Sequence, residues 1–234
     1  MKALGKKALI FGGTSGIGHA VAKQLASLGA EVVSISRNPK KAVNNSNEIL
    51  LERCDVLNRE ALLKLFEKHG PFDILVSTAT GGSRSFGPFL AMDMDGYQAS
   101  FDKLWGYANV VRYGAKHMSE DGAIVLVSGA PAKRAKAGQV SLSSVGASVE
   151  ALVKSIAEEL APRRINVVSP GVIDTPMVAF EGKEREALFK ERTNDHAIPR
   201  AGTADEVAQG ILFAIQNDFI TGTTIDVDGG WLLS

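Results

Sequence analysis

The sequence has little that would direct it to a membrane, a disulfide-linked fold or a nucleic acid. Its single cysteine, Cys54, can form no internal disulfide, which suits a reducing compartment. The 26 basic and 26 acidic side chains are interspersed and cancel, so no field favours nucleic acid or an anionic membrane. No apolar run approaches the roughly 18 residues of a membrane span, and residues 1–15 reach polar residues too early for a secretory segment. We therefore expect a cytoplasmic protein without nucleic-acid or membrane partners.

Histidine is also scarce, with four residues in the whole chain. His69, His117 and His196 show no metal-ligand spacing with one another, so we expect no metal site. A chain without net charge is better suited to small molecules than to polyanions, and we expect a small-molecule substrate.

Short apolar runs alternate along the chain with segments of helical periodicity. The first run, residues 8–11, ends in glycines, and Ile17, Val21 and Leu25 then recur at helical spacing. This alternation predicts a single α/β domain over residues 1–234, a Rossmann-type doubly wound parallel sheet of about seven strands with helices on both faces. Segment 175–203 is charged and poor in strand pattern, and we expect it to be an insertion that covers the substrate. The other expected strands lie at 32–35, 48–54, 72–77, 122–128, 165–169 and near 225, and the other helices at 60–68, 94–118, 140–161 and 204–216.

A glycine-rich segment joins the first strand to the first helix. Residues 12–18 read Gly-Gly-Thr-Ser-Gly-Ile-Gly, so backbone amides and a helix N-terminus face whatever lies beyond the strand. A pyrophosphate is the natural occupant of such a loop, although the same glycines could form an empty tight turn.

Further motifs extend this interpretation over essentially the whole chain. They are Asp55-Val56, Pro170-Gly171-Val172-Ile173-Asp174-Thr175, Thr221-Gly222 and Asp228-Gly229-Gly230. Together with the glycine loop these motifs resemble, in this order, those of the short-chain dehydrogenase/reductase family.

The resemblance implies a site for a nicotinamide dinucleotide. The glycine loop would wrap the pyrophosphate, the pair after the third strand would hold the adenine, and the segment after the sixth strand would bracket the nicotinamide. The family's Asn-Asn-Ala-Gly after the fourth strand is replaced by Ser-Thr-Ala-Thr at 77–80. The implied cofactor-binding residues are Gly12, Thr14, Ser15, Gly16, Ile17, Gly18, Ser36, Arg37, Asp55, Val56, Thr78, Ala79, Pro170, Gly171, Val172, Ile173 and Thr175.

The end of the second strand bears on the choice of cofactor. NAD enzymes of this fold usually have an acid there that binds the adenosine ribose, whereas this chain reads Ser34-Ile35-Ser36-Arg37-Asn38. Arg37 could meet a 2′-phosphate, which favours NADP(H) over NAD(H). The alternative is a solvated loop arginine with weak cofactor preference.

The family's usual proton donor is missing. Most members carry a Tyr-x-x-x-Lys pair on the helix after the fifth strand, where the lysine lowers the tyrosine pKa. Alignment of that helix puts Leu142 in the place of the tyrosine and Gly146 in the place of the lysine. Since no tyrosine in this chain precedes a lysine by four residues, a shifted pair is excluded. The sequence therefore resembles a divergent branch of the family.

Three residues could contribute to a rearranged site. Lys103 replaces the family's asparagine on the long helix, although it could instead be a surface or helix-pairing lysine. Arg134, in the segment after the fifth strand, could polarise a carbonyl or clamp a carboxylate, or belong to a solvated basic loop. Ser128 ends that strand, although the family's catalytic serine corresponds better to Gly129.

Three functions remain open at this point. The chain could be an NADP(H)-dependent oxidoreductase of atypical short-chain dehydrogenase type, a non-redox isomerase or cyclase on the same scaffold, or a non-catalytic NADP(H)-binding protein. The resemblance further implies a homodimer or homotetramer built on helices 94–118 and 140–161.

Overall fold

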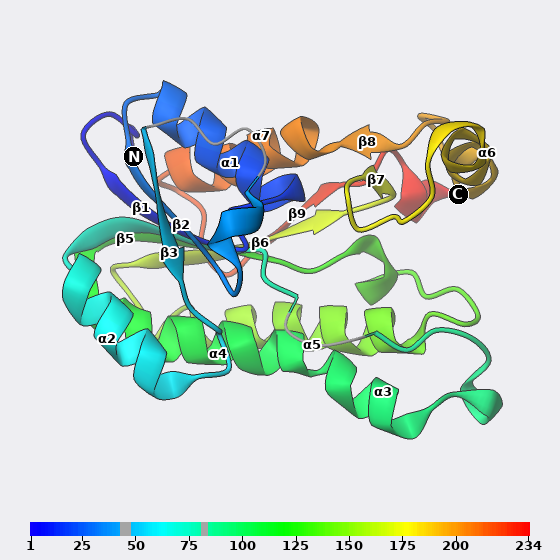
Figure 1. Ribbon diagram of the computed structural model, residues 1–234, viewed down its shortest axis with the longest axis horizontal. Helices are drawn as coiled ribbons and strands as arrows, with labels where there is room; N and C mark the ends of the chain where they lie inside the picture. The colour runs from blue at the N-terminus through cyan, green and yellow to red at the C-terminus, as the bar shows by residue number, and fades with distance from the viewer. Residues whose placement is uncertain (43–47, 81–83) are drawn as a thin grey trace.

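The computed structural model describes residues 1–42, 48–80 and 84–234 (Figure 1). A seven-stranded parallel sheet with the strand order β3-β2-β1-β4-β5-β6-β9 forms its centre. This arrangement confirms the predicted doubly wound fold. The strands are β1 (Lys7–Phe11), β2 (Glu31–Ser36), β3 (Ile49–Arg53), β4 (Phe72–Ser77), β5 (Met118–Val127), β6 (Arg164–Pro170) and β9 (Thr224–Val227).

Helices cover both faces of the sheet, which explains why its strands are apolar on both sides. One apolar cluster packs beneath α1 and α7 and the other beneath α2, α4 and α5 (Figure 1). Ile10 of β1 is buried on the first side, and Leu9 and Phe11 are buried on the second. The covering helices are α1 (Gly16–Ser27), α2 (Arg59–His69), α4 (Asp102–Gly114), α5 (Val140–Ile156) and α7 (Ala204–Gln216).

The long helix expected over 94–118 is two helices. α3 (Met94–Ser100) ends before Phe101, and α4 begins at Asp102. The Ser100 hydroxyl donates to the Gly96 carbonyl four residues earlier at 2.8 Å, an arrangement that bends helices. The α4 helix ends at Gly114, and β5 starts at Met118, four residues before the predicted strand. The break leaves α4 as a separate helix whose first turn carries Lys103.

The last third of the chain builds one side of the sheet's carboxyl edge. A two-stranded ladder of β7 (Ile173–Asp174) and β8 (Gly202–Thr203) brackets α6 (Gly182–Thr193), within the segment predicted as an insertion. The α5 helix ends at Ile156, earlier than expected, and turns follow as far as Arg163. Among the described residues, no helix has the length and apolar character needed to cross a membrane.

Candidate active site

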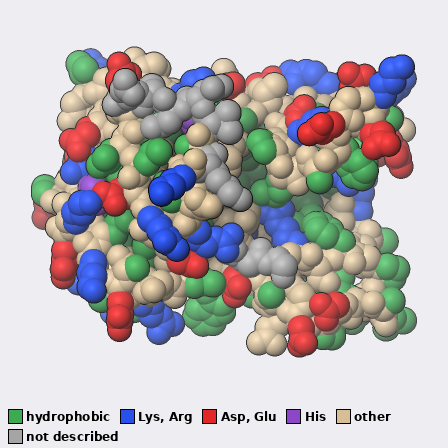
Figure 2. All heavy atoms as spheres, in the orientation of Figure 1, with side chains coloured by type: hydrophobic (Ala, Val, Ile, Leu, Met, Phe, Trp, Pro, Cys, Tyr) green, Lys and Arg blue, Asp and Glu red, His purple; other side chains and the backbone are tan. Residues whose placement is uncertain are grey.

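A cavity of about 950 Å³ opens at the carboxyl edge of the sheet, where ligands bind in folds of this kind. Figure 2 shows a hollow between the part of the molecule that carries α6 and the part that carries α3, with Lys and Arg side chains inside it. All the cofactor-binding and catalytic residues predicted from the sequence line this cavity, except Gly18 and Arg134.

The glycine loop lines the cavity where β1 ends, between the residues that follow β2 and those that follow β4. Gly12 has φ +79°, and a Cβ there would lie 2.5 Å from Thr78 Oγ1. Thr78 Oγ1 donates to the Phe11 carbonyl at 3.2 Å and thereby ties β1 to the end of β4. Ser15 precedes α1 without a side-chain cap, and no acid occupies the first turn of the helix. The amides at the start of α1 are therefore available to an anionic ligand.

Gly18 lies outside the cavity, and its role is close packing behind the loop. A Cβ at this buried position would lie 2.2 Å from the Gly12 carbonyl oxygen and 2.6 Å from Thr78 Oγ1. The structure therefore places Gly18 behind the predicted pyrophosphate contact, where it lets α1 approach the loop.

Replacing Gly18 with alanine is expected to destabilise the fold by roughly 1–3 kcal/mol through overpacking. For a chain of this size the melting temperature falls by about 2–4 °C for each kcal/mol. Gly129→Ala is the matched control, because a Cβ there meets nothing closer than 3.7 Å. Thermal unfolding of both variants checks this, and equal melting temperatures would contradict the packing argument.

One end of the cavity lies beyond β2 and β3, on the side of β1 away from β4. Ser36 ends β2 and Arg37 follows it, while Asp55 and Val56 follow β3. Ser36 Oγ is buried and has no hydrogen-bond partner among the described residues, and the Arg37 side chain is exposed. A hydroxyl and a guanidinium that line the same cavity, with no acid at the strand end, fit an anionic group.

Lys103 extends from α4 into the cavity, toward Ser128, which follows β5. Its Nζ donates to the Ser128 backbone carbonyl at 3.1 Å and lies 5.6 Å from the centre of the Tyr107 ring. Burial, and secondarily the positive charge of Arg84, lowers the pKa of the Lys103 ammonium to about 7. Lys103 is therefore poised to gain or lose a proton near neutral pH.

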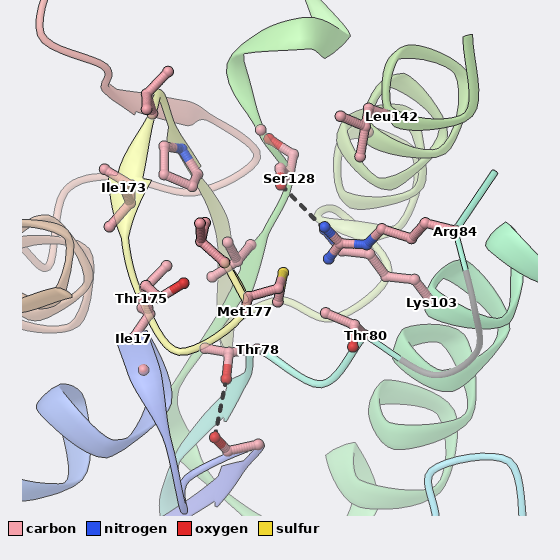
Figure 3. A pocket seen from close by; sticks show the side chains of 18 of the residues that line it. Ile17, Thr78, Thr80, Arg84, Lys103, Ser128, Leu142, Ile173, Thr175 and Met177 are labelled. Atoms are coloured by element: carbon pink, nitrogen blue, oxygen red, sulfur yellow. Dashed lines mark hydrogen bonds between the residues drawn. The ribbon is translucent and has the colours of Figure 1, made fainter. Parts of the chain in front are cut away.

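Sequence reasoning missed Arg84. Figure 3 shows its side chain beside Lys103, reaching toward Ser128 from the side opposite Ile173 and Thr175. Burial lowers the pKa of Arg84 from its ordinary value. The signal available in the sequence was position alone, since Arg84 lies in the loop that leaves the carboxyl end of β4.

The Ser128 hydroxyl is already engaged. Its Oγ donates to Glu150 Oε1 at 2.9 Å, and both residues are buried. Glu150 was also missed, because it lies on the inner face of α5, where its periodicity with apolar neighbours predicts packing alone. Ser128 thus offers the cavity mainly its backbone.

The α5 helix presents Leu142, Val145 and Gly146 to the cavity. Gly146 is closely packed, since a Cβ there would lie 3.0 Å from Ala132 Cβ. The cavity also contains the Tyr107 ring, whose hydroxyl donates to the Val127 carbonyl at 3.2 Å. Burial raises the pKa of Tyr107, so its hydroxyl is a poor acid.

Arg134 does not lie in the cavity, contrary to the expectation from its sequence position. Its side chain is exposed and donates to the Trp231 carbonyl at 3.4 Å. The short helix 130–132 turns the chain so that Pro131 faces the cavity and Arg134 faces outward. The nearby Lys136 does line the cavity and pairs with Asp195 at 3.4 Å.

The segment predicted as an insertion forms another wall of the cavity. Its lining residues lie between 175 and 195 and include Met177, Phe180 and Phe189. In the part of the chain that the structure describes, no three or more His, Cys, Asp or Glu side chains are grouped to hold a metal ion.

Comparison with known proteins supplies context for this arrangement. Residues 12–232 match a family model described as enoyl-(acyl carrier protein) reductase. The chain is 33% identical to carbonyl reductase family member 4 of Danio rerio, over 97% of this chain and 98% of the relative. It is 32% identical to the 3-oxoacyl-[acyl-carrier-protein] reductase FabG of Aquifex aeolicus (strain VF5), over 98% of each chain.

A solved structure is similar over nearly the same length. A small-chain dehydrogenase crystallised in complex with NADPH superposes with a TM-score of 0.83 and 30% sequence identity. The match covers 98% of this chain and 100% of that protein.

Proposed function

The chain belongs to the short-chain dehydrogenase/reductase family, and we propose that it is an NADP(H)-dependent oxidoreductase that reduces a carbonyl group of a small molecule. The observation that carries the proposal is the position of Lys103, whose Nζ donates to the Ser128 carbonyl at 3.1 Å inside a cavity lined by the glycine loop and by the residues that follow β3 and β6. The relative crystallised with NADPH supports the choice of cofactor.

Different groups of cavity residues bind different parts of the cofactor. The amides of the glycine loop and the start of α1 hold the pyrophosphate, and the pair after β3 holds the adenine. The backbone at Thr78 and Ala79 contacts the ribose, and the segment after β6 brackets the nicotinamide. That segment comprises Pro170, Gly171, Val172, Ile173 and Thr175.

Selectivity for NADP(H) rests on Arg37 and the unpaired Ser36 hydroxyl, which together receive the 2′-phosphate. Arg37→Ala should raise the NADPH dissociation constant about tenfold, or about 1.4 kcal/mol, because it removes a charge-assisted contact at an exposed site. Affinity for NADH should not change. Calorimetric titration of both coenzymes checks this, with the exposed Arg112→Ala on α4 as the control. If Arg37→Ala lost the same affinity for NADH as for NADPH, Arg37 would have no part in the selectivity.

The atypical character lies in the proton donor. Leu142 and Gly146 occupy the positions of the family's tyrosine and lysine, and Tyr107 is held by the Val127 carbonyl. Lys103 is then the cavity group with an acidic proton near neutral pH. An acid whose pKa lies near the working pH is the most effective proton donor.

The reaction follows from these placements. When bound, NADPH supplies the hydride that the substrate carbon receives. The electron pair of the C=O π bond moves to oxygen, which takes a proton from Lys103 Nζ and becomes a hydroxyl group. Lys103 is left as a neutral amine and recovers its proton from solvent. The Ser128 carbonyl orients Nζ through the 3.1 Å hydrogen bond.

The proposal also covers the segment over the substrate, the location of the protein and its oligomeric state. Segment 175–203 covers the substrate and excludes water, with Met177 and Phe180 on its inner side. The protein works in the cytoplasm as a homodimer or homotetramer that buries the faces of α4 and α5, where Trp105 is 58% exposed.

Substrate-dependent oxidation of NADPH tests the proposal. The purified protein is screened at pH 6–7 against ketones, aldehydes, imines and enones while absorbance at the nicotinamide band is followed. Oxidation with at least one carbonyl compound is expected, with the alcohol as product. Tight NADPH binding without turnover across the panel would indicate a non-catalytic binding protein. Substrate conversion without net NADPH consumption would indicate an isomerase or cyclase.

A further inference from the structure

Two cationic side chains, Arg84 and Lys103, share the substrate end of the cavity, and neither has an acidic partner among the described residues. Arg84 makes no hydrogen bond or ion pair with any other described residue, and Lys103 donates to a backbone carbonyl. The acids that line the cavity are Asp55, at the adenine end, and Glu191 and Asp195 on the opposite wall. Asp195 is engaged with Lys136.

Holding these cations without a counter-charge is costly. A charge taken out of water loses solvation unless a counter-charge or hydrogen bonds replace it. Lysine can relieve the cost by losing its proton, and the pKa of about 7 shows that tendency in Lys103. Arginine cannot, because its guanidinium remains protonated in proteins. Arg84 therefore keeps a positive charge directed into the cavity, toward the Ser128 side (Figure 3).

We infer that Arg84 binds a carboxylate of the substrate, so that the protein acts on carbonyl compounds that carry an acid group. This inference rests on the proposed function for the carbonyl, whereas the carboxylate site stands on Arg84 alone. The planar guanidinium matches the two oxygens of a carboxylate, and the pair has two parallel hydrogen bonds. Its single permanent charge balances one carboxylate and leaves Lys103 free to give its proton.

The apolar side chains that line the cavity with Arg84 determine which kind of carboxylic acid it prefers. Leu142, Phe86 and Met177 line the same cavity, so the carboxylate is attached to an apolar body. A small aromatic acid has this shape and is not itself reduced. Benzoate is therefore a suitable probe, with neutral benzamide of the same size as its matched partner.

Calorimetric titration of the NADP⁺-loaded protein tests the inference without any turnover. Benzoate is expected to bind at least tenfold more tightly than benzamide, and Arg84→Gln should remove that difference. Arg134→Gln is the control, because Arg134 lies outside the cavity and should leave both affinities unchanged. The melting temperature and NADP⁺ affinity of Arg84→Gln confirm that the variant is folded.

The possible outcomes separate the two proposals. Equal binding of benzoate and benzamide would overturn the carboxylate site, even if the protein oxidises NADPH with neutral ketones. Retention of the difference in Arg84→Gln would overturn the role of Arg84. Tighter binding of phenyl phosphate than of benzoate would replace the carboxylate with a phosphate. Benzoate binding through Arg84 without NADPH turnover would sustain the site while the proposed reductase activity fails.

Discussion

Lys103→Met is expected to lower kcat for NADPH-dependent reduction by about 10²–10⁴-fold, the usual contribution of a general acid. Methionine keeps the unbranched apolar stem of lysine but has no proton to give. The affinity for NADPH should change little, because Lys103 contacts the substrate end of the cavity. Steady-state rates with a carbonyl substrate from the screen, together with NADPH titration, measure the two effects separately.

The control for this variant is Lys116→Met. Lys116 is exposed, lies in the turn between α4 and β5, and is not one of the residues that line the cavity. Its replacement should leave kcat within about twofold, since surface substitutions of this kind rarely perturb a fold. If Lys103→Met retained the full kcat, another group would have to supply the proton and the proposed mechanism would be wrong.

Reductase activity is expected to fall as the pH rises through about 7. The donor must be protonated, and burial lowers the pKa of Lys103 to about 7, so activity is present below that pH and is lost above it. The decline should approach tenfold for each pH unit. The profile of kcat/KM between pH 5.5 and 9 measures it, since this ratio reports the free protein.

The charged and titratable groups around Lys103 determine the pH at which the activity declines. Arg84 lowers the pKa of Lys103 by its charge, whereas Tyr107 is neutral and Glu150 is separated from Nζ by Ser128. A bound carboxylate on Arg84 would raise the pKa of Lys103, so the decline in kcat should occur at higher pH than the decline in kcat/KM. A profile that stays flat from pH 6 to 9 would contradict the assignment of Lys103 as the donor.

Most of the fold could be predicted from the sequence because apolar periodicity directly reflects burial. Strand 72–77 and helix 204–216 have the predicted bounds, since turn-forming or helix-capping residues flank them. The break at Phe101 could not be predicted, because the apolar pattern continues through it. The Ser100 hydroxyl bond to the Gly96 carbonyl lies at the break, but serines of the unbroken α5 make the same bond, so a serine at such a position does not by itself signal a break.

The candidate site was predictable where the backbone forms it and less so where side chains do. Gly12 and Gly16 could be recognised from the sequence because both adopt positive φ, a conformation for which glycine is the usual residue. Arg134 was misplaced because its position in the sequence does not show which way the short helix at 130–132 turns it. Glu150 and Arg84 escaped notice because their roles depend on long-range neighbours, which no local pattern records.

Binding of the coenzyme tests the central claim most directly, because every proposed role assumes it. NADPH and NADH are titrated in turn into the purified, folded protein in a calorimeter. We expect saturable binding of one NADPH per chain, with a lower dissociation constant than for NADH. A folded protein that releases no heat with either coenzyme would contradict the account as a whole.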